Sequence, residues 1–373
     1  MTKVAGGLPP PKSLGGIPAS NLYCVPRGIC AGDTASSLVG AGHGLPLLGS
    51  RHAFAAVEFV VRESKGVTKY AASVTAFNPW RQILNASQQA RIASLLEAVA
   101  KPRPHFAGLS IDKPAIMGIV NVTPDSFSDG GDHATTERAV QHGESLAGAG
   151  AVILDVGGES TRPGAQLVDA ETEQRRVVPV VRALAEKGFV ISVDTRNAST
   201  MSAALAAGAK IVNDVTALTR DTDALKVVVK HKAAVILMHM QGEPQTMQSA
   251  PSYDWVVGDV FDYLSERVDA CLEAGMELDS ICVDPGIGFG KSDIHNGDII
   301  NALSMFHGLG CALMLGASRK SFIGRLTDTE NPKARVSGSI AAALAGAAQG
   351  VSILRVHDVS ETHQALNVWQ YQA

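Results

Sequence analysis

Several short apolar runs in this sequence end on, or are followed by, side chains that bind ligands or carry charge. These groups are Asn121, Asp155, Asp194, Asn213, His239, Asp284, the run Ser318-Arg319-Lys320, and Arg355 with His357. Carboxylates and carboxamides accept hydrogen bonds from the N–H and NH₂ groups of ligands, and a guanidinium group can donate two hydrogen bonds at once to a phosphate. Any one of these residues alone could be a cap with no further task, but eight such positions together favour one polar site.

The runs that position these groups are continuously apolar, as expected for parallel strands that are covered on both faces. They lie at residues 116–120, 152–156, 190–193, 211–212, 234–238, 281–283, 312–315 and 353–356. Helical patterns fill the gaps, most clearly at 171–186, 199–207, 255–274 and 339–348. Eight β-then-α units predict an α/β fold, a (β/α)8 TIM barrel, whose strands would open onto one mouth. An open, doubly wound sheet of about six strands is the alternative.

A change in charge divides the chain near residue 110. Residues 1–112 carry 11 basic and 5 acidic side chains, a net charge of +6, and the remainder carries 21 and 31, a net charge of −10. Residues 1–50 are rich in Gly and Pro, so we expect a flexible segment there. Residues 51–110 predict a small α+β module of ββα type, with strands at 53–61 and 67–77 and a helix at 88–100, and residues 111–373 form the barrel. We expect the module to pack on the barrel without supplying catalytic groups.

Composition excludes several classes of protein. With 32 basic and 36 acidic side chains there is no excess positive charge for nucleic acid, and 46% hydrophobic residues exclude a disordered chain. We find neither a membrane span nor a secretory signal, so a cytoplasmic location is expected. The five cysteines form no C-x-x-C pair, which predicts free thiols and no zinc site.

Two glycine-rich segments look like nucleotide-binding motifs. Residues 286–292 read GIGFGKS, but Pro285 stands where a P-loop needs its first glycine, and Lys291 stands where a dinucleotide fingerprint needs its last. These glycines are therefore expected to shape a loop. Residues 157–164, GGESTRPG, are rich in hydrogen-bonding groups and predict a mobile lid.

Five longer motifs together resemble the dihydropteroate synthase family of pterin-binding enzymes. They are NVTPDSFSDGG at 121–131, residues 155–164, DPGIGFGK at 284–291, SRKSFIG at 318–324 and RVHDV at 355–359. The resemblance covers residues from about 110 to the end and leaves the N-terminal part unexplained. It implies condensation of 6-hydroxymethyl-7,8-dihydropterin diphosphate with 4-aminobenzoate, which gives 7,8-dihydropteroate and pyrophosphate for folate synthesis. It also implies a homodimer and a pocket that sulfonamides occupy.

The resemblance assigns roles to the residues at the mouth. Asp194, Asn213 and Asp284 would bind the pterin edge, with Met238 on a ring face and Lys320 beside the carbonyl. A helix cap is the competing interpretation of Asp194. Loss of pyrophosphate would be dissociative, with Mg²⁺ held by Asn121, Asp155 as a hydrogen-bonding neighbour, and the leaving group bound by Arg162, Arg355 and His357.

The resemblance also places the second substrate. Residues around 4-aminobenzoate would be Thr161, Pro163, Phe289, Lys320 and Ser321, and the loops 121–132 and 157–164 would close over both substrates. Phe289 has a competing interpretation as a core aromatic that anchors the glycine loop. Two other functions stay open: a pterin-binding methyltransferase domain that works with a corrinoid, and an inactive scaffold subunit of a folate enzyme.

Overall fold

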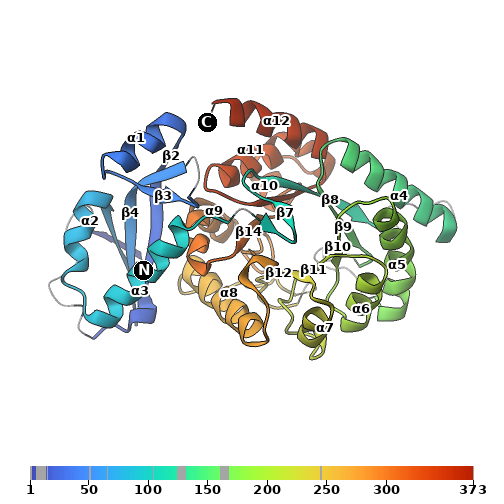
Figure 1. The fold of residues 1–373 in the computed structure, drawn as a ribbon, viewed down its shortest axis with the longest axis horizontal. Coiled ribbons are helices and arrows are strands. Elements are labelled where there is room, and N and C mark those ends of the chain that lie inside the picture. Colours follow the sequence, from blue (N-terminus) through green and yellow to red (C-terminus); the bar gives the residue numbers. More distant parts are fainter. Residues whose placement is uncertain are drawn as a thin grey trace.

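Eight short parallel strands close into a barrel in the computed structural model of the protein, with the last strand paired to the first (Figure 1). The structure describes residues 2–5, 14, 16–49, 52–64, 66–103, 105–123, 132–159, 168–243 and 246–372. Each of the eight apolar runs contributes one strand, so the predicted TIM barrel is confirmed and the open sheet is excluded. The strands are β8 Ala115–Asn121, β9 Ile153–Gly157, β10 Ile191–Asp194, β11 Ile211–Asp214, β12 Ala234–Met238, β13 Ile281–Asp284, β14 Ala312–Leu315 and β15 Ile353–Val356.

Helices follow the strands and cover the outside of the barrel (Figure 1). They are α4 Asp132–Gly148, α5 Ala170–Glu186, α6 Ala198–Ala206, α7 Ala224–His231, α8 Val256–Glu273, α9 Asp293–Asn301, α10 Ser321–Leu326, α11 Val336–Ala347 and α12 Val359–Gln372. Short 3-10 turns lie at η1 Ala19–Asn21, η3 Leu278–Ser280, η4 Leu303–Leu309 and η5 Pro332–Ala334. The four helices expected from the sequence are present, with ends shifted by at most a few residues.

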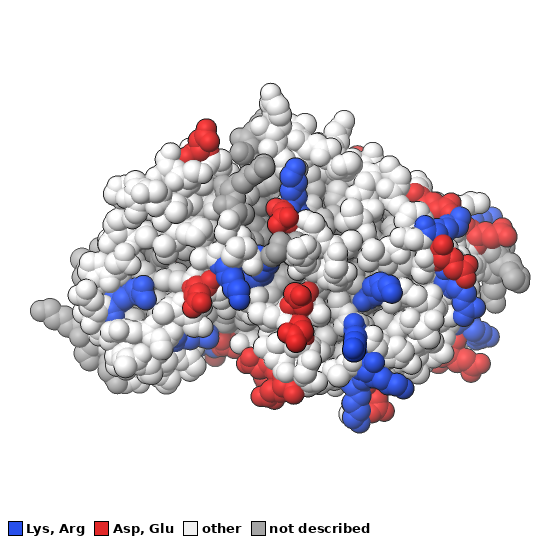
Figure 2. All heavy atoms as spheres, viewed as in Figure 1, with Lys and Arg blue, Asp and Glu red and all other residues white. Residues whose placement is uncertain are grey.

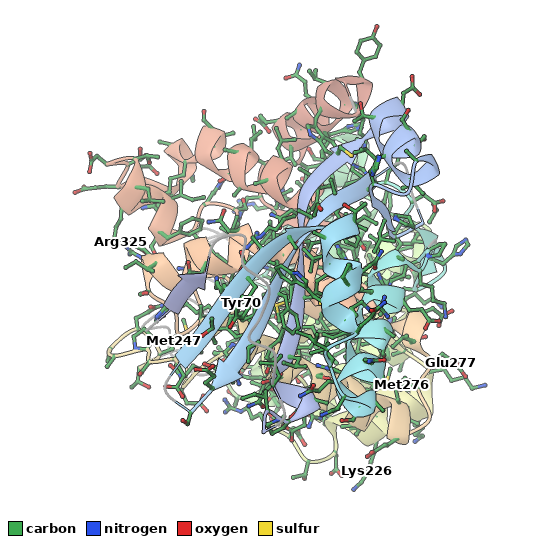
Figure 3. All side chains as sticks on the ribbon, turned by 90° about the vertical axis from the view of Figure 1, so that its left-hand side faces the viewer. Tyr70, Lys226, Met247, Met276, Glu277 and Arg325 are labelled. Atoms are coloured by element: carbon green, nitrogen blue, oxygen red, sulfur yellow. The ribbon has the colours of Figure 1, made fainter. Side chains whose placement is uncertain are left out.

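The barrel interior is apolar at one end and polar at the other. Met117, Ile153, Ile236 and Met314 form a buried cluster with Phe106, which belongs to the hairpin of β6 His105–Phe106 and β7 Leu109–Ser110. This hairpin therefore closes the end where the strands begin. In Figure 3, Met276 and Glu277, which precede β13, lie on the side opposite Met247 and Arg325, which follow β12 and β14. The polar site lies at the end where the strands finish.

A mostly antiparallel sheet, with β1 parallel to β5, precedes the barrel and is larger than the expected ββα module. Its strands, β1 Thr2–Ala5, β2 Leu22–Ala31, β3 Leu45–Leu47, β4 His52–Glu63 and β5 Gly66–Ser73, are ordered β1-β5-β4-β2, with β3 also on β4. Its helices are α1 Gly32–Gly40, α2 Val74–Arg81 and α3 Ala86–Ala100. The expected strand at 53–61 and helix at 88–100 are present.

The prediction that residues 1–50 are flexible is wrong for residues 16–49. Leu22, Tyr23, Cys24 and Val25 are buried, and β2 pairs with β4 at every residue except Gly28. The Gly and Pro content of residues 1–50, which includes Pro26 within β2, is the pattern that favoured a flexible chain. Because β2 lies at an edge of the path through the sheet, a proline is tolerated there.

The strand expected at 67–77 ends early. Strand β5 stops at Ser73, whose hydroxyl accepts a hydrogen bond from the amide of Ala76 at 3.2 Å and so caps α2. The apolar alternation continued past Ser73, but this cap turns the chain into a helix.

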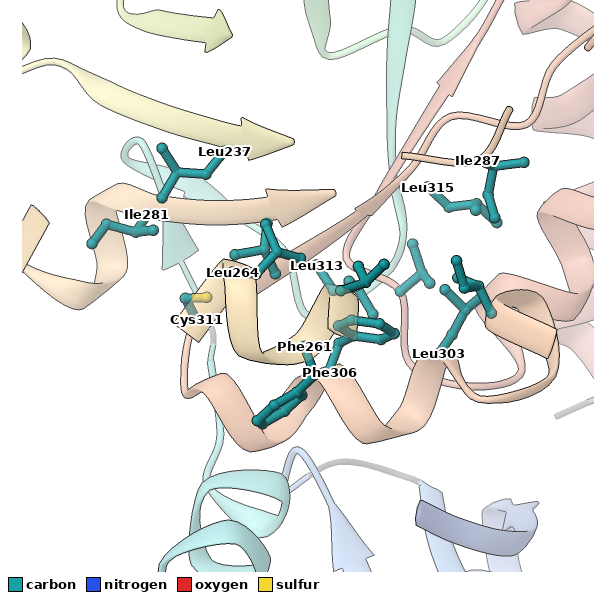
Figure 4. Close-up of a cluster of buried hydrophobic side chains, with 14 of the residues drawn as sticks. Leu237, Phe261, Leu264, Ile281, Ile287, Leu303, Phe306, Cys311, Leu313 and Leu315 are labelled. Atoms are coloured by element: carbon teal, nitrogen blue, oxygen red, sulfur yellow. The ribbon is translucent and has the colours of Figure 1, made fainter. Parts of the chain in front are cut away.

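The sheet and the barrel share one apolar core. Phe261 on α8 and Phe306 on η4 are buried with ring centroids 6.1 Å apart (Figure 4), and the guanidinium of Arg91 on α3 lies 5.8 Å from the Phe261 ring. Tyr23 on β2 packs edge-on against Trp255 at 5.0 Å. The module therefore packs on the barrel, as expected.

Arg62 on β4 links the two parts by two ion pairs. It bonds Asp259 at 2.8 Å and Asp262 at 3.0 Å, and it also lies over the rings of Tyr23 and Trp255. Replacing Arg62 with methionine is expected to lower the free energy of unfolding by about 2 kcal/mol, because two half-buried carboxylates lose their cation. Urea unfolding measures this.

The matched control for this stability prediction is Arg325→Met. Arg325 also bonds a carboxylate, that of Asp293, but its side chain is 56% exposed. Its loss should cost less than about 1 kcal/mol. Equal losses for the two variants would contradict a structural role for Arg62.

The distribution of surface charge and the state of the cysteines agree with the expectations from composition. Figure 2 shows basic and acidic side chains interspersed on this face, without a broad area of one sign. All five cysteines are free. None of the helices in the described ranges has the length and hydrophobicity needed to cross a bilayer.

Candidate active site

A guanidinium group joins two carboxylates at the centre of the barrel mouth. Nε of Arg355 on β15 donates to Oδ2 of Asp155 at 2.6 Å, and Nη2 donates to Oδ2 of Asp194 at 2.7 Å. The side-chain amide of Asn213 donates to the same oxygen of Asp155 at 3.0 Å. Four strands, the consecutive β9, β10 and β11 together with the distant β15, thus meet in one hydrogen-bonded group. Asp155 lies in the middle of β9 rather than at its end.

Burial shapes the charge of this group. The side chain of Asp155 is fully buried, and its Oδ1 has no hydrogen-bond partner among the described residues. Burial raises the pKa of Asp194, and the neighbouring charge of Arg355 opposes that rise. Two carboxylates with one cation leave a net negative site that can accept N–H donors from a ligand.

Asp284 and Lys320 form the opposite side of the mouth. Asp284 ends β13, is buried, and accepts the amide of Gly286 at 2.8 Å. Burial raises the pKa of Asp284, whereas burial lowers the pKa of Lys320 to about 8 and the charge of Asp284 counteracts this. A Cβ on Gly316 would lie 3.6 Å from Oδ2 of Asp284 and 3.9 Å from Cβ of Arg355, so both halves of the site share this space.

The glycine loop after β13 needs its glycines. Gly286, Gly288 and Gly290 have φ values of 70°, 81° and 62°. A Cβ on Gly286 would lie 2.0 Å from the carbonyl oxygen of His239, and one on Gly290 would lie 2.3 Å from that of Gln241. The prediction that these glycines shape a loop is confirmed. The loop carries Phe289, whose ring centre lies 4.6 Å from Nζ of Lys320.

A tight turn after β14 presents Lys320 and Ser321. Arg319 adopts φ 58° within this turn, and Nε of Arg319 donates to Asp358 at 2.9 Å. The hydroxyl of Ser318 lies 3.1 Å from Nδ1 of His357 and accepts the amide of His357 at 3.1 Å. The strained backbone of Arg319 is thereby held by His357 and Asp358, which follow β15.

Asn121 and Met238 are also placed at the mouth. Asn121 is the last residue of β8, half-buried, and pairs in register with Gly157. Met238 ends β12 and is buried, and a Cβ on Gly286 would lie 3.3 Å from its Cγ. Ser321 is exposed at the start of α10.

Three predicted site residues lie outside the described residues. They are Thr161, Arg162 and Pro163, together with most of the expected lid at 157–164 and most of the loop 121–132. The structure brings the other predicted residues to one end of the barrel on the ends of several strands.

Two buried ionisable groups at the site were missed as a pair. Lys291 is 1% exposed, and its Nζ lies 2.9 Å from Nδ1 of His239. His239 stood out as a residue after a strand, but nothing in the sequence linked it to Lys291, which is 52 positions away. A second missed pair is the buried ion pair of Glu159 and Arg196 at 2.8 Å.

The arrangement suits recognition of a flat, hydrogen-bonding ring next to an anion. Carboxylates and an amide lie on rigid strand ends, a methionine is adjacent, and cations flank them. Within the described ranges no group of three or more His, Cys, Asp and Glu side chains is placed to hold a metal ion.

Comparison with known proteins connects this geometry to a family. The family model described as "Pterin binding enzyme" matches residues 117–357. The dihydropteroate synthase of Escherichia coli (strain K12) is 47% identical over 261 residues, which cover 70% of this chain and 92% of that protein.

Solved structures of dihydropteroate synthases are also similar to this chain. The dihydropteroate synthase of Xanthomonas albilineans with 4-aminobenzoic acid has a TM-score of 0.68 and 48% identity, covering 72% of this chain and 98% of that one. The same enzyme in complex with 7,8-dihydropteroate has a TM-score of 0.65, 47% identity, and coverage of 71% and 95%. The Yersinia pestis enzyme in a sulfonamide drug complex has a TM-score of 0.67, 43% identity, and coverage of 71% and 96%.

Proposed function

This chain belongs to the dihydropteroate synthase family of pterin-binding enzymes, and we propose that the residues described above at the barrel mouth bind its substrates and carry out its reaction. The chain is a transferase that condenses 6-hydroxymethyl-7,8-dihydropterin diphosphate with 4-aminobenzoate to give 7,8-dihydropteroate and pyrophosphate. The observation that carries the residue assignment is the joining of Asp155, Asp194 and Asn213 through Arg355 at one mouth. Neither the methyltransferase nor the scaffold alternative has support, since the relatives named above are all dihydropteroate synthases.

The pterin ring binds to Asp194, Asn213 and Asp284 in this proposal. Its ring N–H and NH₂ groups need acceptors, and carboxylates on rigid strands supply them with little reorganisation. Met238 lies on a ring face, and Lys320 donates to the pterin carbonyl. Asp194 is already bonded to Arg355, which favours this ligand role over the helix-cap alternative, and no cap hydrogen bond from its side chain to α6 is present in the described residues.

Cleavage follows from charge stabilisation. The bond between the pterin methylene carbon and the diphosphate oxygen breaks, and its electron pair leaves with the diphosphate. The amine nitrogen of 4-aminobenzoate then bonds to the methylene carbon and loses one proton to water. We assign Arg162, Arg355 and His357 to the leaving group, since guanidinium and imidazolium groups bind phosphate oxygens well. Among the described contacts, Arg355 keeps Nη1 for this task.

Asn121 and Asp155 fit a magnesium ion that arrives with the diphosphate. Mg²⁺ takes few protein ligands and keeps waters or substrate phosphates in its other positions. Asp155 pairs in register with Ile119 on β8, and Asn121 lies two residues further toward the mouth on the same strand, where it offers an amide oxygen. The buried Oδ1 of Asp155 has no hydrogen-bond partner among the described residues. We assign Asn121 as the protein ligand. When bound, Mg²⁺ neutralises charge on the leaving group.

The second substrate would lie at Phe289, Lys320 and Ser321, with Thr161 and Pro163. Lys320 offers a cation and Ser321 a hydroxyl to the carboxylate of 4-aminobenzoate, and Phe289 a ring face. The relatives above include one with 4-aminobenzoic acid and one with a sulfonamide drug, so the same pocket is our candidate for sulfonamide binding here. The loops 121–132 and 157–164 would exclude water during the reaction.

The proposal includes three coarser expectations. Residues 111–373 form the pterin-binding barrel, and the N-terminal sheet module, which includes β1 and β2 as well as residues 51–110, supplies no catalytic group. The protein is a homodimer, which the molar mass in solution tests. It works in the cytoplasm, where five free thiols would stay reduced.

Pyrophosphate release tests the activity and the metal assignment together. Release should require both substrates and Mg²⁺, with one pyrophosphate formed per dihydropteroate. Asn121→Ala is expected to raise the Mg²⁺ concentration for half-maximal rate about tenfold or more, because the ion loses its protein ligand. Asn301→Ala, an exposed residue at the end of α9, is the control. An unchanged Mg²⁺ dependence in the Asn121 variant would remove Asn121 from the metal site.

A further inference from the structure

Lys291 is a buried lysine at the base of the glycine loop with no role so far. It is 1% exposed, and its ammonium contacts Nδ1 of His239 at 2.9 Å, the carbonyl of Phe289 at 3.0 Å and the carbonyl of His239 at 3.3 Å. An ammonium has three N–H donors, so three acceptors satisfy it fully.

None of these three acceptors carries a negative charge. Burial lowers the pKa of Lys291, and burial together with the charge of Lys291 lowers the pKa of His239 to about 2. The imidazole is therefore neutral and accepts at Nδ1. Burying an ammonium group among neutral partners costs free energy. We therefore expect the contacts of Lys291 to be needed by the fold around the site.

The contacts of Lys291 belong to a loop in which each of four successive carbonyls accepts a hydrogen bond from a side chain, three of them from residues outside the loop. The carbonyl of Ile287 accepts from Lys320, that of Gly288 from Gln248, that of Phe289 from Lys291, and that of Gly290 from Tyr253 at 2.7 Å. Lys291 thus holds the peptide that bears the Phe289 ring.

That peptide governs the side of the mouth assigned to the second substrate. The Phe289 ring lies against the ammonium of Lys320, and Lys320 donates to Ile287 two residues before Phe289. A shift of the Phe289 peptide would move the ring and the Lys320 ammonium relative to each other. Asp194, Asn213 and Arg355 make no contact with the loop in the described hydrogen bonds. Asp284 bonds the loop at Gly286, three residues before Phe289, so its anchor does not depend on Lys291 and the pterin side is less exposed to such a shift.

We propose that Lys291 is a positioning residue that, with His239, fixes the Phe289 loop and so sets the affinity for the aromatic amine substrate rather than for the pterin. This inference rests on the proposed placement of 4-aminobenzoate beside Phe289. Lys291 itself touches neither substrate, and it acts through the peptide that it holds.

The split between the two KM values tests the inference. Lys291→Met is expected to raise KM for 4-aminobenzoate about tenfold or more, since the Phe289 carbonyl and His239 lose their donor. KM for the pterin diphosphate should change less than about threefold. Lys291→Gln can still donate one N–H to Phe289, so it should recover part of the lost affinity. A merely structural role would lower stability without separating the two KM values.

Two further variants separate the possible failures. Lys226→Met, at a lysine that is 79% exposed on α7, should leave both KM values unchanged. Phe289→Ala should raise KM for 4-aminobenzoate; if it does not, the proposed pocket is wrong. If Phe289→Ala raises it and Lys291→Met does not, the inference about Lys291 is overturned. Should Lys291→Met fail to fold, Lys291→Gln decides, and failure of both to fold also overturns the inference, because Lys291 would then act in folding.

Discussion

Replacing Asp284 with asparagine is expected to reduce kcat/KM for the pterin diphosphate about 1,000-fold while leaving the fold intact. Asp284 is 2% exposed, and one of its oxygens already accepts the amide of Gly286 at 2.8 Å. The asparagine has one acceptor oxygen and one donating NH₂. Whichever way it turns, a donor faces either Gly286 or the pterin, and a buried donor without an acceptor costs the most.

The pH profile of this variant provides a second measurement. Burial lowers the pKa of Lys320 to about 8, and the negative charge of Asp284 partly offsets this lowering. Without that charge the pKa of Lys320 falls further, so the ammonium is lost at lower pH. The alkaline limb of kcat/KM in Asp284→Asn should therefore lie at lower pH than in the unaltered enzyme.

Stability separates this effect from damage to the fold. Burial raises the pKa of Asp284, which means that ionisation of the carboxyl is unfavourable in the folded state. Its neutral replacement should keep or raise Tm. Asp279→Asn, an exposed residue just before β13, is the control for both measurements. A folded Asp284 variant with less than a tenfold loss would remove Asp284 from the pterin site.

Sequence patterns predicted the barrel because its strands are buried on both faces. A run such as 234–238 is apolar throughout, and β12 occupies the same residues. The site could be predicted for the same reason: closure of the barrel brings the ends of these strands together, whatever their separation in the chain.

The missed features depend on partners distant in the sequence. Strand β2 contains Pro26, and only its place at the edge of the path through the sheet makes that proline acceptable. The contact of Lys291 with His239 depends on how two loops meet over the ends of β12 and β13. No local pattern encodes such a contact.

The hydrogen bonds that Arg355 makes to two carboxylates could not be predicted from local sequence patterns either. Arg355 was expected at the diphosphate, but in the structure two of its nitrogens bond Asp155 and Asp194, 200 and 161 positions away. The guanidinium is therefore part of the wall of the site as well as a candidate ligand for the leaving group. This dual role leads to the largest stability effect that we expect.

Arg355→Gln is expected to lower the free energy of unfolding by about 3–5 kcal/mol at neutral pH. The side chain of Asp155 is fully buried and that of Asp194 is 12% exposed, so without the guanidinium two close carboxylates face each other with no cation. Glutamine fills part of the volume but brings no charge. Activity should also be lost, because the carboxylates proposed to bind the pterin and the proposed leaving-group site change together.

The pH dependence of this loss identifies its cause. Burial and the charge of Asp155 already raise the pKa of Asp194, and removal of Arg355 takes away the main opposing contribution. A carboxyl whose pKa is higher in the folded state than in the unfolded state binds more protons when folded, so stability is greatest at low pH and falls as pH rises. Urea unfolding of Arg355→Gln should therefore show a free energy that decreases from pH 5 to pH 8, by up to about 1.4 kcal/mol per pH unit for each such group.

A charge-balanced double variant completes the test. Arg355→Gln combined with Asp194→Asn removes one carboxylate along with the cation, so it should recover much of the stability and flatten the pH dependence. It should recover no activity, since both groups belong to the proposed site. Arg355→Lys keeps the charge but cannot bond both carboxylates in the fork geometry. Its stability should lie between that of the unaltered protein and that of Arg355→Gln. If the loss in Arg355→Gln is independent of pH, its origin is packing around β15 rather than the two carboxylates.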